Sequence, residues 1–354
     1  MIQLRCHAAW LFTLIAMTVS AQPYSARNTT VDGISVVELS DTSRNTSVSI
    51  VPSVGNIAYR MDVNGKNVFW FPFDSVKDFV AAPKQSGNPF LAPWANRLDE
   101  EAFYANGKKY LLNPALGNFR KDPNDQPIHG LLVYASAWEV VSLESNAGGA
   151  YVTSRLEFSR HANWMAQFPF AHTIEMTYRL HEGALEVHTR IHNIGAQIMP
   201  LSVGYHPYFQ LHDAPRDDWR VRLAAESVWT LNDQLIPTGK TKPIAAVLGD
   251  ASNLSLKGLF LDHVLGGLVR DGGGAASFSV QGARQKIEVV FGPKYRTAVV
   301  YAPTRKDQNF ICFEPMSGIT NAFNLAHRGI YKDLQTIPAG RAWEESYWIR
   351  PSGF

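Results

Sequence analysis

The stretch HTIEMTYRLHEGALEVHTRIHN, residues 172–193, decides the fold class. Apolar and polar side chains alternate on both sides of Glu182-Gly183, and a period of two residues is typical of a strand with one buried face. The glycine in Glu182-Gly183 favours a tight turn between the two alternating runs. The stretch therefore predicts a pair of antiparallel strands.

The second of these strands carries polar side chains that could be mistaken for a metal site. Glu186, His188, Arg190 and His192 share one face of it. Residues four positions apart on a strand lie roughly 13 Å from each other, so His188 and His192 are too far apart to hold one metal ion alone. We interpret this face as solvated and expect no metal site.

The same alternation recurs along most of the chain. Strands and hairpins are expected over residues 46–51, 59–70, 102–112, 138–158, 268–282, 286–292 and 297–303, with Asn-Gly turns at 64–65 and 106–107. No long segment shows a convincing helical period, and no repeat or linker divides the chain. The patterns predict an all-β fold, a large antiparallel β-sandwich, which forms a single domain over residues 46–354 after a lead-in over residues 22–45.

Residues 1–21 have the pattern of a secretory signal peptide. Arg5 precedes the apolar run Ala9–Val19, which is too short to cross a bilayer, and small residues stand before a cleavage point after Ala21. The alternative is an amphipathic or buried first helix. We expect cleavage after Ala21 and a periplasmic or secreted protein. No later segment has the roughly 20 apolar residues of a membrane helix, so no membrane contact is expected after cleavage.

The overall charge excludes several classes of partner. The chain has 33 basic and 31 acidic side chains, a formal net charge of +2 at pH 7, and no basic run. This balance is not that of a protein that binds nucleic acid or an anionic membrane. Of the two cysteines, Cys6 lies in the signal sequence, so Cys312 is left alone and no internal disulfide can form. The sequence does not predict the oligomeric state.

Polar side chains that interrupt the alternation are the candidates for function, because rigid sheets present functional groups at strand ends and in loops. The first place is NPFLAPWANRLDE, residues 88–100, where Asn96 and Arg97 follow an apolar stretch that contains prolines. An amide and a guanidinium beside aromatic surface are suited to a polar ligand. The alternative is a structural ion pair of Arg97 with Asp99 or Glu100.

Two histidines mark the second and third places. His129 stands in QPIHGLL, residues 126–132, and the alternative to a functional role is a turn histidine whose ring is bonded to the backbone. His206 stands in VGYHPYFQL, residues 203–211, where a proline follows it. That proline is expected to end or kink a strand, so His206 would project from a stiff position backed by aromatic rings. The alternative is a core histidine held by a neighbouring tyrosine.

The fourth place is NFICFEPMSGITNAFN, residues 309–324, in which Glu314 lies in an otherwise apolar strand. Apolar surroundings favour the neutral form of a carboxylate, and this is how a general base is tuned toward neutral pH. The alternative is a buried structural ion pair. Cys312 shares the strand face of Glu314, and we interpret it as a small apolar core residue. The glycines at 272–274 have no helix after them, so they do not form a phosphate-binding loop.

Taken in order, these motifs resemble the aldose 1-epimerase (galactose mutarotase) family. SVGYHPYFQL is the most specific of them, and ANRL, IHGLL with WEV, and ICFEPMSGITNAFN occur in the family's order. The resemblance runs from about Ser47 to Trp348. It implies a galactose mutarotase-like β-sandwich with the sugar in a cleft across one sheet, and no metal or organic cofactor. The substrate would be a small-molecule sugar.

The resemblance also implies a role for each candidate residue. Glu314 would be the general base that takes the proton from the anomeric hydroxyl, and His206 the general acid that protonates the ring oxygen. His129 would bind near the ring oxygen and polarise the substrate. The residues that would hold sugar hydroxyls are Asn96, Arg97 and, in the segment FLDHV, Asp262.

Three departures from the family pattern put the substrate in doubt. Ala92-Pro93-Trp94 stands where members carry Gly-Arg, HGLLVYAS replaces the common motif after the first histidine, and no glutamine occurs in residues 299–305. These departures are typical of a divergent secreted member. We expect interconversion of the α and β anomers of a free aldose. The alternatives are a hexose-6-phosphate 1-epimerase and a non-catalytic carbohydrate-binding protein on the same fold.

Overall fold

The computed structural model describes residues 22–354. The expected signal peptide, residues 1–21, lies outside the described residues, so its cleavage and the periplasmic or secreted location stay predictions. Among the described residues, no helix has both the length and the apolar character needed to cross a membrane.

Two large antiparallel sheets form the body of the protein. The nine-stranded sheet has the order β11 (Glu139–Asn146), β12 (Gly149–Glu157), β13 (His172–His181), β14 (Ala184–Asn193), β28 (Ala342–Ser352), β24 (Lys286–Phe291), β23 (Ala276–Gln281), β18 (Arg220–Arg222) and β21 (Leu254–Ser255). The eight-stranded sheet has the order β20 (Pro237–Pro243), β19 (Ala225–Leu231), β22 (Leu261–Leu268), β25 (Thr297–Ala302), β26 (Ile311–Met316), β16 (Gly204–Tyr205) and β6 (Phe90–Leu91), and β17 (Tyr208–Phe209) also pairs with β26. The all-β prediction is confirmed.

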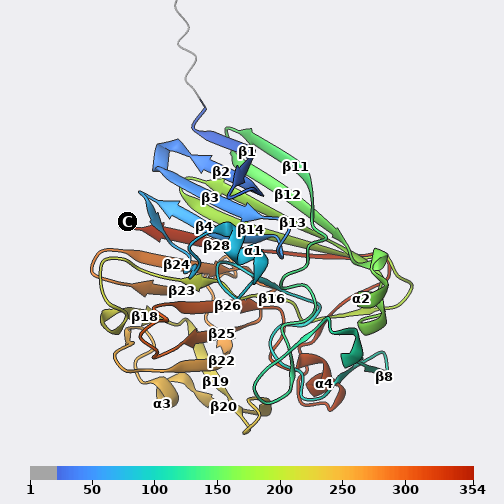
Figure 1. Cartoon of the computed structure of the whole chain (residues 1–354). Helices are drawn as coiled ribbons and strands as arrows, with labels where there is room; N and C mark the ends of the chain where they lie inside the picture. The colour runs from blue at the N-terminus through green and yellow to red at the C-terminus, as the bar shows by residue number, and fades with distance from the viewer. Residues whose placement is uncertain (1–21) are drawn as a thin grey trace, which may run out of the picture.

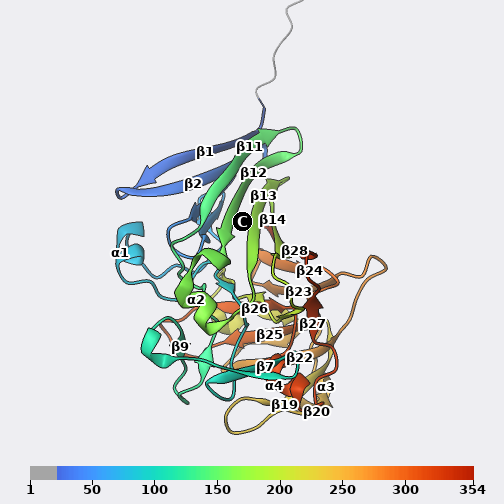
Figure 2. The same ribbon diagram turned by 90° about the vertical axis from the view of Figure 1, so that its right-hand side faces the viewer.

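A third, five-stranded sheet is built from β1 (Tyr24–Val31), β2 (Ile34–Asp41), β3 (Thr46–Val51), β4 (Ile57–Val63) and β5 (Lys66–Asn67) in that order. Its first two strands occupy the segment expected to be a lead-in, and β2 pairs with β3 from Val37↔Ile50 to Asp41↔Thr46. Figures 1 and 2 show β1 and β2 at one end of the molecule, beside β11, and β19 and β20 at the other.

The remaining elements are short. Three two-stranded ladders are formed by β7 (Ala102–Ala105) with β8 (Lys108–Leu111), β9 (Arg120–Lys121) with β10 (Pro127–Ile128), and β15 (Met199–Leu201) with β27 (Gln335–Ile337). The α-helices are α1 (Val76–Ala81), α2 (Ala162–Gln167), α3 (Ile244–Leu248) and α4 (Ala322–His327). None of these α-helices exceeds six residues, in agreement with the lack of helical periodicity in the sequence.

Most of the expected hairpins are present. Strands β13 and β14 pair up to His181↔Ala184 around Glu182-Gly183, and burial alternates residue by residue along both. The Asn-Gly turns at 64–65 and 106–107 join β4 to β5 and β7 to β8, and all four residues have the positive φ that such turns need.

The hairpin expected over residues 268–282 is wrong. The turn exists, and Arg270 and Ala276 form one isolated bridge across it. Beyond that bridge the two strands separate, because β22 is already paired with β19 and β25, while β23 is paired with β24 and β18. The glycine-rich turn therefore carries the chain from one large sheet to the other.

The core between the large sheets decides which side chains of β26 face outward. The ring of Phe313 packs against Phe278 of β23 with centroids 5.9 Å apart, and Tyr205 of β16 packs against Tyr347 of β28 at 4.9 Å. Successive residues of a strand point to opposite faces. Because Phe313 faces the other sheet, Cys312 and Glu314 lie on the opposite face of the eight-stranded sheet.

Candidate active site

A cleft of about 530 Å³ lies on this outward face of the eight-stranded sheet. Its lining includes all six residues to which the resemblance gives a role, namely Asn96, Arg97, His129, His206, Asp262 and Glu314. These residues come from five separate parts of the chain, so the fold brings together what the sequence keeps apart. Their roles in catalysis and binding stay predictions.

Strand register fixes the floor of the cleft. Asp262 on β22 is paired with Tyr301 on β25, which is paired with Cys312 on β26. Glu314 lies two residues further along β26 and so shares their face. Asp262, Tyr301 and Glu314 therefore project into one cleft from three neighbouring strands.

His206 enters from the break between β16 and β17. Pro207 leaves no ladder donor there, and the backbone nitrogen of His206 donates to the carbonyl of Pro89 at 3.0 Å. The ring stacks on Tyr208 with centroids 4.6 Å apart and an interplanar angle of 9°. The expected strand break is confirmed. Tyr208 contacts the ring of His206, as the core-histidine alternative requires. The ring also lines the cleft, however, so it is not enclosed in the core.

The closest contact in the site joins His206 to Glu314. His206 Nε2 lies 3.2 Å from Glu314 Oε1, and Glu314 is only 1% exposed. Glu314 Oε2 and His206 Nδ1 are buried and have no hydrogen-bond partner among the described residues. Such unpaired buried atoms are costly, and a bound ligand would satisfy them.

Burial favours the neutral form of both groups. It raises the pKa of Glu314 well above its ordinary value, and it lowers the pKa of His206 to about 3. A neutral acid with a neutral imidazole holds the same number of protons as a carboxylate with an imidazolium. One proton that moves along the 3.2 Å contact therefore converts the first state into the second.

His129 stands beside this pair in a strained backbone conformation. Its φ is 63°, that of Asn96 is 57°, and the backbone nitrogen of His129 donates to the carbonyl of Asn96 at 2.9 Å. The rings of His129 and His206 meet edge to face with centroids 5.4 Å apart. His129 Nδ1 is buried without a partner among the described residues, so the ring-to-backbone bond of the turn-histidine alternative is absent there. Burial lowers the pKa of His129 well below its ordinary value.

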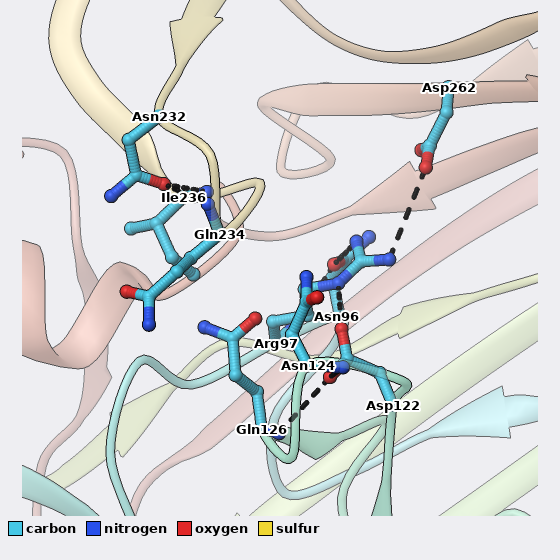
Figure 3. A network of polar contacts seen from close by, with 9 residues as sticks. All are labelled: Asn96, Arg97, Asp122, Asn124, Gln126, Asn232, Gln234, Ile236 and Asp262. Atoms are coloured by element: carbon cyan, nitrogen blue, oxygen red, sulfur yellow. Dashed lines mark hydrogen bonds and ion pairs between the residues drawn. The ribbon is translucent and has the colours of Figure 1, made fainter.

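Arg97 lies between two carboxylates, as Figure 3 shows. Its Nε donates to Asp122 Oδ2 at 2.7 Å, and its Nη2 is 4.0 Å from Asp262 Oδ2. Burial raises the pKa of Asp262, and the positive charge of Arg97 partly offsets this. The alternative partners suggested by the sequence are wrong, because Asp99 binds Arg328 and Glu100 binds Lys109.

Asp122 is the member of this group that the sequence did not reveal. Its side chain is 2% exposed, and its Oδ1 accepts hydrogen bonds from the backbone nitrogens of Asn124 at 2.9 Å and Gln126 at 3.0 Å. The segment Asp122-Pro123-Asn124 has the composition of an Asx turn, which is a signal that could have identified the loop. Nothing in that signal links the loop to Arg97.

Aromatic rings form one wall of the cleft, and aromatic surface was expected near His206 and beside Asn96 and Arg97. Trp70 and Phe310 lie 4.5 Å apart, and both pack against Tyr208. Cys312 lies buried behind Tyr208 and Phe310, and burial raises the pKa of its thiol well above the ordinary value. Cys312 is therefore a core residue, as expected, and not a reactive thiolate.

Two further predictions concern ligands. In residues 22–354 no group of three or more His, Cys, Asp or Glu side chains is placed to hold a metal ion. His188 donates to or accepts from Ser346 Oγ at 3.0 Å on the half-exposed face of β14, in agreement with a solvated face. The expectation of a site without an organic cofactor stays a prediction. Residues 299–305 contain no glutamine, but Gln308 in the loop that follows lines the cleft.

Solved structures share this fold along nearly the whole chain. A galactose mutarotase-like protein from Clostridium acetobutylicum superposes with a TM-score of 0.83 at 18% identity, over 94% of this chain and 100% of that one. Galactose 1-epimerase from Lactobacillus acidophilus superposes with a TM-score of 0.72 at 13% identity, over 94% and 99% of the two chains. At these identities the likeness shows the fold alone.

Sequence comparison gives the family. The uncharacterised protein YihR of Escherichia coli K12 is 24% identical over 253 residues, which cover 71% of this chain and 74% of that one. The sequence model described as aldose 1-epimerase matches residues 36–350. The match supports a sugar epimerase or mutarotase activity in general, with a small-molecule sugar as substrate. It includes strands of all three sheets and every residue that lines the cleft, and the chain belongs to the aldose 1-epimerase family.

Proposed function

We propose that the protein interconverts the α and β anomers of a free aldose by opening and reclosing the pyranose ring. The observation that carries the proposal is the 3.2 Å contact between His206 and Glu314 inside the cleft. Ring opening requires one group that accepts a proton and another that donates one at the same hemiacetal, and this pair supplies both.

The reaction uses the proton that the pair already holds. Glu314 as carboxylate takes the proton of the anomeric hydroxyl while His206 as imidazolium protonates the ring oxygen. The bond between C1 and O5 breaks, and an open-chain aldehyde forms. Rotation about the C1–C2 bond then presents the other face of the carbonyl. The same two proton transfers in reverse close the ring as the other anomer and restore the starting state of the enzyme.

The neighbouring residues hold the sugar while this happens. His129 offers a buried Nδ1 that has no partner within residues 22–354 and lies beside His206, which suits a polar contact near the ring oxygen. Arg97 and Asp262 present charged groups to sugar hydroxyls, and Asp122 keeps Arg97 in place. The aromatic wall of Trp70 and Phe310 excludes water and suits the C–H faces of a pyranose.

Polarimetry on freshly dissolved anomers tests the proposal, at a pH where spontaneous mutarotation is slow. The protein should accelerate the decay of optical rotation for at least one common aldose. Glu314→Gln and His206→Asn should each lower kcat by about a hundred- to ten-thousand-fold, which is the usual contribution of one positioned proton transfer.

Matched controls on the outside of the sheets are Glu226→Gln and His192→Asn. Glu226 is exposed and His192 is half-exposed, and neither lines the cleft, so both variants should keep the wild-type rate. If every aldose equilibrates at its spontaneous rate in the presence of the protein, the proposal is wrong. Sugar binding without turnover would point instead to a carbohydrate-binding protein.

A further inference from the structure

The lining of the cleft includes more cationic than acidic side chains. Four cationic residues line the cleft, namely Lys84, Arg97, Arg120 and Lys121. Two of them have carboxylate partners: Arg97 binds Asp122, and Lys121 binds Glu101 and Asp125. Within residues 22–354 no carboxylate forms an ion pair with Arg120 or Lys84.

Arg120 contacts the chain segment that carries Lys84. Arg120 Nη2 donates to the side-chain oxygen of Gln85 at 3.4 Å, and Gln85 is the neighbour of Lys84 in the chain. The guanidinium of Arg120 also lies over the ring of Tyr134, 5.7 Å from its centroid. Both contacts orient Arg120, and neither cancels its charge.

Backbone pairing fixes Arg120 beside the catalytic centre. In the ladder of β9 and β10, Arg120 is paired with Ile128, the residue that precedes His129. Some exposed arginines are paired with acids on neighbouring strands, such as Arg27 with Glu38 and Arg155 with Glu175. Arg120 differs from them because it lines a cleft and has no such partner.

The positive charge of Arg120 acts on the residues that move protons. After burial, the charges of Arg120 and Arg97 are the next influences that lower the pKa of His206, and both also lower the pKa of His129. The proposed reaction needs His206 as an imidazolium, so the positive charge of Arg120 opposes the protonation state that the reaction uses. An anion bound at Arg120 would remove part of this opposition.

We propose that the sugar bound in this cleft carries an anionic substituent, which Arg120 and Lys84 bind while the anomeric carbon lies at His206 and Glu314. The inference rests on the proposed function, since it assigns the substrate class of the same cleft. A guanidinium and an ammonium that line one cleft can bind carboxylate, sulfate and phosphate oxygens alike, so the shared chemistry is that of a hexuronate, a sugar sulfate or a sugar phosphate.

Anomerisation measured by NMR exchange spectroscopy tests this class and separates its three sources. Glucuronate, glucose 6-sulfate and glucose 6-phosphate are each compared with glucose, and the corresponding galactose series is compared with galactose. At least one anionic sugar should have a kcat/KM about tenfold or more above that of its neutral parent, as expected for hydrogen bonds to a charged group. Added salt should reduce this ratio.

Variants locate the effect. Arg120→Gln and Lys84→Gln should each lower the ratio of anionic to neutral kcat/KM by about fivefold or more. Lys242→Gln, an exposed cation on β20 that does not line the cleft, should leave both values unchanged. The inference is overturned if the neutral sugars match or exceed the anionic ones in every arm, or if Arg120→Gln keeps the wild-type ratio.

Calorimetric binding to Glu314→Gln separates this inference from the proposed function. One outcome is that the wild type turns over no sugar, while Glu314→Gln binds an anionic sugar and the double variant Glu314→Gln, Arg120→Gln does not bind it. In that case the mutarotase proposal fails and the anion site stands. If Glu314→Gln binds anionic sugars no more tightly than neutral ones, the proposal of an anion site is wrong. Turnover of neutral sugars alone would leave the mutarotase proposal intact and refute the anion site.

Discussion

Asp122 is the side chain whose replacement tests the geometry of the cleft most directly. Its Oδ2 accepts from Arg97 Nε at 2.7 Å, and its Oδ1 accepts from the backbone nitrogens of Asn124 and Gln126. One oxygen holds the guanidinium and the other holds the loop. Asp122→Asn separates the two tasks, because the amide oxygen can serve the loop while the amide nitrogen cannot accept from Arg97.

A second turn of this protein shows that asparagine fits the same loop. Asn232 Oδ1 accepts from the backbone nitrogens of Gln234 at 3.0 Å and Ile236 at 2.9 Å, with the same spacing along the chain, and Figure 3 shows both turns. We therefore expect Asp122→Asn to keep the loop, and to change the Tm far less than Asp122→Ala, which removes both oxygens.

The magnitude follows from burial. The side chains of Asp122 and Arg97 are 2% and 14% exposed. Breaking a fully buried ion pair costs about 3–5 kcal/mol, and one hydrogen bond to a charged group contributes about 1.5–3 kcal/mol. Without the carboxylate of residue 122, Arg97 would still have Asp262 at 4.0 Å and be partly exposed to water. The expected loss is therefore about 1.5–3 kcal/mol, the range for one hydrogen bond to a charged group. If Arg97 orients the sugar, kcat/KM should fall about 10- to 150-fold.

The assay is the kcat/KM of anomerisation, measured beside the Tm of each variant. Asp271→Asn is the matched control, because Asp271 accepts from Gly273 and Ala275 in an equivalent exposed turn that contacts no cleft residue. It should change neither quantity. A wild-type kcat/KM for Asp122→Asn would refute the role of Asp122 in positioning Arg97. A loss of Tm as large as that of Asp122→Ala would refute the separation of the two tasks.

Two further outcomes follow from the structure. Gly130→Ala should lower the free energy of unfolding by several kcal/mol and impair His129, because a Cβ at Gly130 would lie 2.1 Å from the carbonyl oxygen of Ala92. The control is Gly33→Ala, which shares the positive φ but meets nothing within 4 Å and should cost about 1 kcal/mol. Urea titrations measure both losses, and equal losses would contradict this prediction. Burial lowers the pKa of His172 to about 4, so this side chain binds its proton at a higher pH in the unfolded chain than in the folded one, and its contribution should make the free energy of unfolding fall as the pH is lowered from 6.5 toward 4. In His172→Phe this fall should be shallower, and an unchanged slope would contradict the assignment.

The fold class could be predicted because a period of two is a local property. In β13 and β14 the alternation of residue types matches the alternation of burial at most positions, and the buried polar residues His172, Thr189 and Asn193 are exceptions. Partner choice is not local, and this is why the hairpin expected over 268–282 is wrong. The sequence favours pairing of β22 with β23, but β22 is paired with β19 and β25, and β23 is paired with β18 and with β24, which follows it in the chain. The strands β1 and β2 were missed because few of their residues are buried, one of eight in β1 and four of eight in β2.

The candidate site was predictable only in part. His206 and Glu314 stand out because each interrupts an apolar strand, but only the family resemblance linked them, and only the fold shows that they lie 3.2 Å apart. The ion-pair partners that the sequence suggested for Arg97 were its near neighbours Asp99 and Glu100. Its partner in the structure is Asp122, which lies 25 residues away. A charged side chain finds its partner through the tertiary structure, and no sequence pattern at Arg97 records which loop will cover it. The unpaired state of Arg120 is likewise a property of the folded surface.

The packing of the core and the geometry of the site are linked through β26. Phe313 is buried against Phe278 and Phe209, and its neighbour Glu314 must point the other way because the strand is extended. A slip of β26 by one residue would expose Phe313 and bury Glu314 between the sheets, which would lose a large apolar side chain from the core and leave a carboxylate without a partner. The same burial that stabilises the sandwich therefore sets the direction of Glu314. Truncation of the buried Phe313 side chain would leave a cavity and should move Glu314 relative to His206. It should therefore reduce the rate of anomerisation more than an equally destabilising truncation of Phe158, which lies in a different part of the core.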